Sequence, residues 1–249
     1  MNFFQKLSNG WDISLNSFKV LLENKQLIIF PILSGISMLA LTLSFIVAIL
    51  AAAGWDADMI SEQSTPGRYA GLFLFYMLNY LIVVFFNTAL IHCSTLYFRG
   101  ERPTVRAGLA FSVSRLELIL IWSLFAATIG FLLRILQENL GSVGRLITGL
   151  IGIVWNIATF FAVPVMIYEQ TGPIETVKRS AGIMKEKWGE RIGAAFSFGI
   201  IYILALFLGG GILFALGLII HPVVGIVLAV IGALAVIAVL SATQTIFVS

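Results

Sequence analysis

The chain has 249 residues, of which 59% are hydrophobic and only 11% are charged. Soluble domains carry roughly 25% charged residues, so this composition excludes a water-soluble globular protein and indicates one membrane domain over residues 1–249. The net charge of +3 does not indicate a nucleic-acid partner, because the basic residues flank apolar segments and form no common exposed face.

Six apolar runs follow one another along the chain, at residues 27–54, 69–97, 116–136, 146–167, 192–220 and 223–247. A helix of about 20 residues crosses a hydrocarbon core of about 30 Å, and the runs lack the alternation of barrel strands. We therefore predict an all-α membrane protein with six transmembrane helices. The first run is too long for the apolar region of a signal peptide, so we expect it to be retained.

Twelve of the fifteen Lys and Arg residues fall in the segments 1–26, 98–115 and 168–191, and only Arg68, Arg134 and Arg145 fall elsewhere. Basic loops stay in the cytoplasm, so both termini are predicted there and the protein is expected in the inner (cytoplasmic) membrane. The residues of these segments predicted to contact anionic phospholipid headgroups are Lys19, Lys25, Arg102, Arg106, Arg115, Lys178, Arg179, Lys185, Lys187 and Arg191.

Each basic segment also carries apolar residues at helical spacing, which predicts a cytoplasmic amphipathic helix. These stripes are Trp11, Leu15, Phe18 and Leu22; Val105, Leu109, Val113 and Leu116; and Val177, Ala181, Met184 and Trp188. Two interpretations remain open. The helices lie in the membrane interface with their apolar faces toward lipid, or they pack beneath the transmembrane bundle.

The segments Thr104-Val105-Arg106 and Thr176-Val177-Lys178 each precede a further pair of apolar runs. Together with a weaker alignment of Ser17 to Ser180, they predict three parallel repeats of an amphipathic helix and a transmembrane hairpin. The predicted repeats cover residues 1–100, 101–168 and 169–249.

The stretch from Glu169 through Gly172-Pro173-Ile174-Glu175 to Lys187-Trp188-Gly189 resembles a known cytoplasmic segment. It is similar to that of bacterial YciC-like envelope proteins and of the membrane domain attached to some glycerophosphodiester phosphodiesterases. The resemblance is best over residues 164–192 and implies a six-helix fold. It implies no activity, because this chain has no counterpart of the phosphodiesterase catalytic domain, and it implies further residues after Ser249.

Neutral polar residues lie within the predicted spans, whereas ionisable residues are missing from the span centres, which argues against ion-coupled transport. We expect these polar residues either to bond neighbouring helices or to line a polar path. The residues of the candidate path are Asn79, Asn87, Thr88, Asn156, Thr159, Ser241 and Thr243.

Proline and glycine mark two irregular places in the spans. Pro164 predicts a kink in the fourth run, because it removes a backbone hydrogen bond. Gly209, Gly210 and Gly211 predict either a helix break or a close approach of helices in the fifth run. Gly225, Ala229 and Ala233 form a stripe of small residues for packing against a neighbour in the chain or in a second copy.

Catalytic and metal-binding motifs do not emerge from the sequence. His92 and His221 fall on opposite sides of the predicted membrane, and Cys93 is the lone cysteine. We predict a protein without enzymatic activity or cofactor. The first functional hypothesis is an oligomeric channel or passive transport protein. The alternative is a lipid-binding envelope scaffold or accessory subunit held by its basic interfacial helices.

Overall fold

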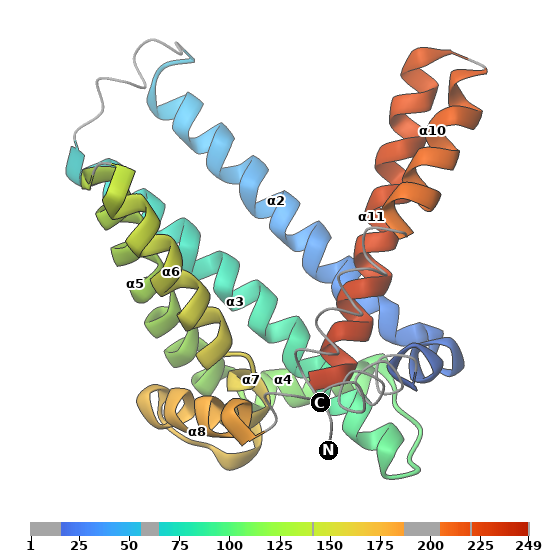
Figure 1. The fold of residues 1–249 in the computed structure, drawn as a ribbon, viewed down its shortest axis with the longest axis horizontal. Helices are drawn as coiled ribbons and strands as arrows, with labels where there is room; N and C mark the ends of the chain where they lie inside the picture. The colour runs from blue at the N-terminus through green and yellow to red at the C-terminus, as the bar shows by residue number, and fades with distance from the viewer. Residues whose placement is uncertain (1–15, 56–64, 141, 187–204, 220, 249) are drawn as a thin grey trace. The chain divides into compact units, whose positions relative to one another are not determined.

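The computed structural model describes residues 16–55, 65–140, 142–186, 205–219 and 221–248, and these residues form helices and no strand (Figure 1). The predicted all-α class is therefore confirmed for the described part of the chain. The described residues belong to two compact units. The first unit comprises Met1–Ile32, Leu90–Gly108 and Ile183–Ser249, and the second comprises Leu33–Ala89 and Leu109–Gly182.

Four helical segments in the described residues are long and apolar enough to cross a membrane. They are Lys25–Ala52, Gly67–Phe98, Leu116–Asn139 and Pro222–Val248. A fifth crossing results if the bent pair Gly144–Ala158 and Ala162–Glu169 counts as one span. The first four and the sixth predicted runs thus have helical counterparts. Residues 192–204 of the fifth predicted run lie outside the described residues.

In the second unit, α2 (Ile29–Ala52) and α3 (Thr65–Phe98) meet through aromatic side chains, with the Phe45 and Phe75 rings 5.2 Å apart. Helices α5 (Leu116–Asn139) and α6 (Ser142–Ala158) form a hairpin. The Trp122 and Trp155 rings stack across this hairpin, with centroids 6.5 Å apart and planes inclined by 9°. Large rings fill the space between helices that stand apart.

The bend between α6 and α7 (Ala162–Glu169) measures 42°. It occurs just before Pro164, which cannot donate the hydrogen bond that Phe160 would otherwise accept. In the same stretch, the Phe160 N–H donates to the Ile157 carbonyl at 3.4 Å, and the Ala162 N–H donates to the Thr159 carbonyl at 2.9 Å. The predicted kink is therefore present, and the helix tightens into three-residue turns on the N-terminal side of the proline.

In the first unit, α10 (Gly211–Leu218) and α11 (Pro222–Val248) form a hairpin that Figure 1 shows in orange and red. The backbones touch at its turn, because a Cβ placed on Gly217 would lie 2.5 Å from the Gly225 Cα. A Cβ on Gly225 would in turn lie 3.1 Å from the Phe214 carbonyl oxygen. Gly225 of the predicted small-residue stripe thus has its neighbour within the chain.

The glycine triplet stays helical. Leu206–Gly210 forms a π-helical turn, η3, and α10 follows it directly. Gly210 and Gly211 have φ of −71° and −67°, within the right-handed helical region. The triplet therefore does not break the helix. Gly210 approaches α11, because a Cβ there would lie 3.8 Å from the Ala229 carbonyl oxygen, which is an ordinary van der Waals contact. The widened turn retains helical dihedral angles, and the close contact occurs later, at Gly217.

Candidate functional site

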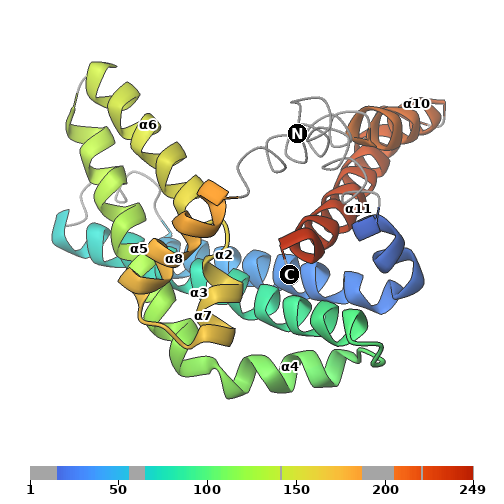
Figure 2. The ribbon, with the colours of Figure 1, turned by 60° about the horizontal axis from the view of Figure 1, so that its bottom comes forward.

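The junction between α7 and α8 (Pro173–Glu186) concentrates polar contacts in the second unit. Helix α7 ends where Gln170 adopts a left-handed conformation, with φ 52° and ψ 40°. Pro173 opens the next helix, at the position where its missing N–H costs nothing. Figure 2 shows α7 and α8 beside the start of α5. In the sequence, the start of α5 and the α7–α8 junction adjoin the basic segments 98–115 and 168–191, which are predicted to be cytoplasmic.

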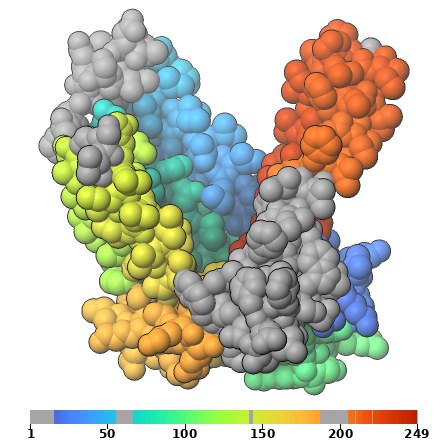
Figure 3. Space-filling model, in the orientation of Figure 1, coloured from blue at the N-terminus to red at the C-terminus, as the bar shows by residue number. Residues whose placement is uncertain are grey.

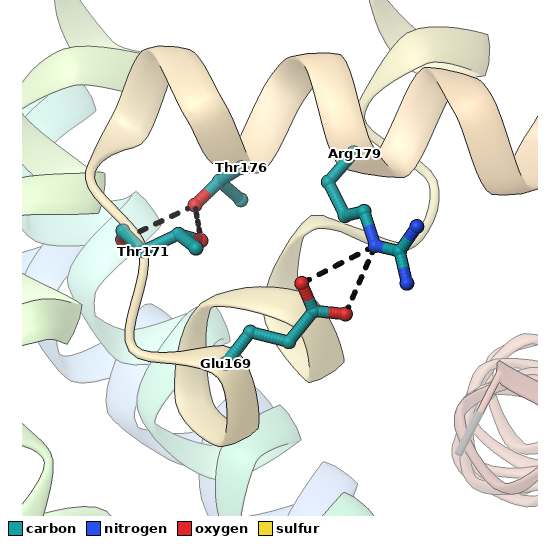
Figure 4. Close-up of polar contacts among 4 residues, drawn as sticks. All are labelled: Glu169, Thr171, Thr176 and Arg179. Carbon is teal, nitrogen blue, oxygen red and sulfur yellow. Dashed lines mark hydrogen bonds and ion pairs between the residues drawn. The ribbon is translucent and has the colours of Figure 1, made fainter.

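Two pairs of side chains close the α7–α8 junction, as Figure 4 shows. The hydroxyls of Thr171 and Thr176 lie 2.8 Å apart, and Thr176 is fully buried. The Arg179 Nε donates to both carboxylate oxygens of Glu169 at 3.1 and 3.2 Å. The first pair secures the turn from within, whereas the ion pair is exposed and therefore contributes little to stability.

Ser180 fixes α8 against the bend of the preceding span. It is fully buried, and its Oγ accepts the Phe161 N–H at 3.0 Å. Phe161 caps α7 and has a non-helical backbone, with φ −100° and ψ 11°. The hydroxyl on α8 therefore satisfies a backbone donor at the start of α7, which would be costly to leave unpaired in an apolar environment.

Helix α4 (Val105–Ser114) uses a hydroxyl in a similar way. Ser112 is fully buried, and its Oγ donates to the Phe85 carbonyl of α3 at 2.8 Å. By contrast, Val113 of the predicted apolar stripe is 60% exposed. Short helices at Val105–Ser114 and Pro173–Glu186 thus lie where the sequence predicts amphipathic helices, and each buries small hydroxyl residues. Trp188 of the third predicted stripe lies outside the described residues. The cytoplasmic location of these helices stays a prediction. The first predicted helix is described only for residues 16–23, so Trp11 and Leu15 lie outside the described residues.

Arg115 lies at the corner between α4 and α5, next to Gln170 of the α7–α8 junction. Its guanidinium carbon stands 5.5 Å from the centre of the Phe111 ring. The Gln170 amide oxygen, in the orientation that satisfies both groups, accepts from its Nη1 and Nη2 at 3.3 and 3.2 Å. In the part of the chain that the structure describes, Arg115 has no carboxylate within ion-pair distance, and its buried Nε has no acceptor.

A cavity of about 110 Å³ opens between α5 and the α7–α8 junction. Its apolar wall comes from α5 and α7, and its polar rim comes from the junction and the first turn of α8. The lining residues are Leu118, Ile121, Trp122, Met166, Gln170, Thr171, Gly172, Pro173 and Thr176. We refer to this space as the junction cavity.

The predicted lipid-contacting residues are mostly exposed. Those with exposed side chains are Lys19, Lys25, Arg102, Arg106, Lys178, Arg179 and Lys185. Arg115 is half-buried, for the reasons given above. Lys187 and Arg191 lie outside the described residues. Figure 3 shows α8, the helix that carries Lys178 and Lys185, uncovered at the lower left of the face drawn.

The residues of the candidate polar path divide between the two units. Ser241 and Thr243 belong to the first unit, and the remaining five belong to the second. Asn79, Thr159 and Thr243 each donate to the carbonyl four residues earlier in their own helix, at 2.8 Å. The Thr88 hydroxyl is buried and has no hydrogen-bond partner among the described residues. Asn156 is exposed, while Asn87 and Ser241 are half-buried.

Sequence reasoning singled out the basic residues of this region and missed the hydroxyl residues and the cavity. Thr176 and Ser180 are spaced four residues apart, which is the available signal that one helix face is small and polar. Trp122 and Met166 carried no signal, because each resembles any other apolar residue of a span. In the described residues, no group of three or more His, Cys, Asp or Glu side chains is arranged to hold a metal ion.

Long apolar helices and short basic helices at their ends define this molecule as a helical integral membrane protein. The chain belongs to the family of unknown function DUF6159, whose profile matches residues 67–248. That match covers α3 through α11 and includes the α7–α8 junction. The chain has no match among curated proteins. The resemblance to YciC-like proteins and to the phosphodiesterase membrane domain stays a prediction.

Proposed function

We propose that this protein is a membrane scaffold without enzymatic activity that binds anionic phospholipid headgroups through its basic cytoplasmic helices. The supporting observation is the sorting of residues around α8. Thr176 and Ser180 are fully buried on one face, while Lys178 and Lys185 are exposed on the opposite face. Ile174, also on that face, is 64% exposed. An apolar side chain beside two lysines suits the boundary between acyl chains and headgroups.

This proposal includes the finer topology expected from the sequence. Six spans, cytoplasmic termini and a location in the inner membrane place the basic helices at the cytoplasmic leaflet. Anionic lipids of that leaflet attract each nearby Lys or Arg by about 1 kcal/mol. Since the attraction is screened over about 8 Å at physiological ionic strength, we expect lipid enrichment to weaken with added salt.

The test measures the preference for phosphatidylglycerol over phosphatidylcholine around the protein in mixed vesicles, using spin-labelled lipids. The Lys178→Gln/Lys185→Gln double variant should lose about half or more of the enrichment, because each lysine contributes about 1 kcal/mol near the surface. The matched control is Arg68→Gln/Arg145→Gln, which removes the same charge from the loops predicted outside. Equal losses in both variants, or none in the first, would contradict the proposal.

Passive transport by a homo-oligomer is a second candidate, and one observation favours it. The buried Thr88 hydroxyl lacks a partner among the described residues, as a group that meets a solute or water would. The hydrogen bonds that Asn79, Thr159 and Thr243 make within their own helices favour a structural role for those residues. Solute flux into liposomes that is lost on Thr88→Val would support transport. Absence of flux from a folded, reconstituted protein would exclude it.

A further inference from the structure

We infer that the junction cavity and Arg115 together bind one anionic glycerophospholipid molecule per chain. The cavity would hold the glycerol unit and the first acyl carbons, and Arg115 would bind the phosphate. This inference rests on the proposed function and specifies it, because it separates one tightly bound lipid from the lipids that merely surround the basic helices.

The position of the cavity meets the first requirement of such a site. Leu118, Ile121 and Trp122 belong to the first two turns of α5, directly after the basic segment that ends at Arg115. Ile121 is 45% exposed, and its neighbour Leu124 is 49% exposed. In a membrane these exposed apolar side chains meet acyl chains, so the cavity opens to lipid near the headgroup level.

The lining of the cavity changes character from one side to the other. Trp122 and Met166 are almost completely buried and form an apolar wall. Gln170 and Thr171 supply an amide and a hydroxyl on the rim. Lipids show the same change over a few atoms, from acyl chain through ester and glycerol to phosphate. A volume of about 110 Å³ exceeds several-fold the 10–15 Å³ that one water-sized group needs, so it admits this segment and not a whole acyl chain.

Arg115 supplies the charge that such a ligand requires. Its guanidinium is half-buried, faces the Phe111 ring and contacts Gln170, yet has no carboxylate within ion-pair distance in the described residues. A partly desolvated cation without a counter-ion is costly, and phosphate oxygens match the planar fork of arginine. Because Gln170 contacts Arg115 and also lines the cavity, a phosphate bound by Arg115 would lie at the rim of the cavity.

The apolar wall distinguishes a membrane phospholipid from a soluble phosphate. Free glycerol phosphate would meet Arg115 but would leave Trp122, Met166 and Leu118 without a partner. A phospholipid fills the wall with its first methylene groups, and it reaches the cavity laterally within the membrane.

Native mass spectrometry of the full chain in a mild detergent tests the inference. After lipid removal, the protein is titrated with phosphatidylglycerol, and we expect one molecule to bind more tightly than all further ones. Leu118→Trp fills the cavity and Arg115→Gln removes the charge, so each should weaken this first binding about tenfold. The control Arg106→Gln removes the same charge from the exposed side of α4 and should leave the first binding unchanged.

Ile121→Trp provides a second cavity-filling variant at a partly exposed position, where the larger ring is accommodated more easily, so the test does not depend on the folding of Leu118→Trp alone. Retention of the first lipid by Arg115→Gln and by the folded cavity-filling variants would overturn the inference. Glycerol 3-phosphate that binds as tightly as phosphatidylglycerol would also overturn it. Failure of the proposed function has a different signature, since Lys178→Gln/Lys185→Gln would then leave the surrounding lipid composition unchanged while the single lipid stays bound.

Discussion

Two hairpins of the chain are held together by opposite means. In the α10–α11 hairpin, Gly217 and Gly225 let the backbones touch. In the α5–α6 hairpin, Trp122 and Trp155 fill the space between the helices with stacked rings. Burial of apolar side chains gives little driving force in lipid, so helices associate through close packing or specific contacts. The α10–α11 hairpin therefore depends on direct contact between its backbones, and the α5–α6 hairpin depends on large side chains between its helices. We expect the two hairpins to differ in how well they tolerate substitutions.

The largest effect is expected from Gly217→Leu. The new Cβ would fall 2.5 Å from the Gly225 Cα, which belongs to backbone that cannot move aside without opening the hairpin. We expect the free energy of unfolding in mixed micelles to fall by about 3 kcal/mol, the upper end of overpacking costs. Gly149→Ala is the control, because its Cβ has nothing within 4 Å. An unchanged midpoint for Gly217→Leu would contradict the close backbone contact.

Trp155→Ala should lower the free energy of unfolding by about 2 kcal/mol, because it removes the ring contacts with Trp122 and Phe125. The effect is smaller than that of Gly217→Leu because the Trp155 ring is only half-buried. The same micelle titration measures the change, and Trp155→Phe should recover part of it. Val154→Ala serves as control on the same helix, since Val154 is 64% exposed. If the two alanine variants lose the same stability, the aromatic stack does not hold the hairpin.

Ser180→Ala addresses a third kind of contact, one hydroxyl to one backbone donor. The variant removes the hydroxyl that accepts the Phe161 N–H, and we expect the free energy of unfolding to fall by about 1.5 kcal/mol. Faster hydrogen exchange at the Phe161 amide should accompany it. Ser114→Ala is the matched control, because the Ser114 hydroxyl is exposed and bonds only within its own turn, to the Phe111 carbonyl. Equal exchange rates in wild type and Ser180→Ala would show that α8 does not secure the bend.

The smallest effect is expected from Arg179→Gln, which removes the exposed ion pair with Glu169. We expect the free energy of unfolding to fall by about 0.5 kcal/mol in an uncharged detergent at low salt, and to be almost unchanged at 1 M salt. Arg134→Gln breaks the comparable exposed pair with Glu138, four residues later on α5, and should have a similar effect. A loss that persists at high salt would assign Arg179 a contact beyond this ion pair.

The sequence was sufficient for those features that depend on a single segment. Apolar length predicted the long helices, charge and spacing predicted the short helices Val105–Ser114 and Pro173–Glu186, and Pro164 predicted the bend in the fourth run. The buried hydroxyl face of α8 was harder to foresee, because the sequence does not show which side of a helix faces lipid and which faces protein. Ser180 gains its role only from its contact with Phe161.

The junction cavity could not be predicted at all. Its lining combines Leu118 of α5 with Met166 of α7 and Thr176 of α8, and no period or motif links these positions. The hairpin contact shows the same limit on a smaller scale. Gly225 was noted as part of a small-residue stripe, but its partner Gly217 was not, because the two lie on opposite sides of a turn whose geometry decides their approach.

The hydrogen bond from Phe161 to Ser180 also has a consequence for biosynthesis. Its acceptor lies 19 residues after its donor in the chain, so this contact can form only after the start of α8 has been synthesised. At 5–20 residues per second, the synthesis of those 19 residues takes about one to four seconds. The contact that joins α8 to the bend is therefore completed later in synthesis than the α5–α6 hairpin that precedes it in the chain.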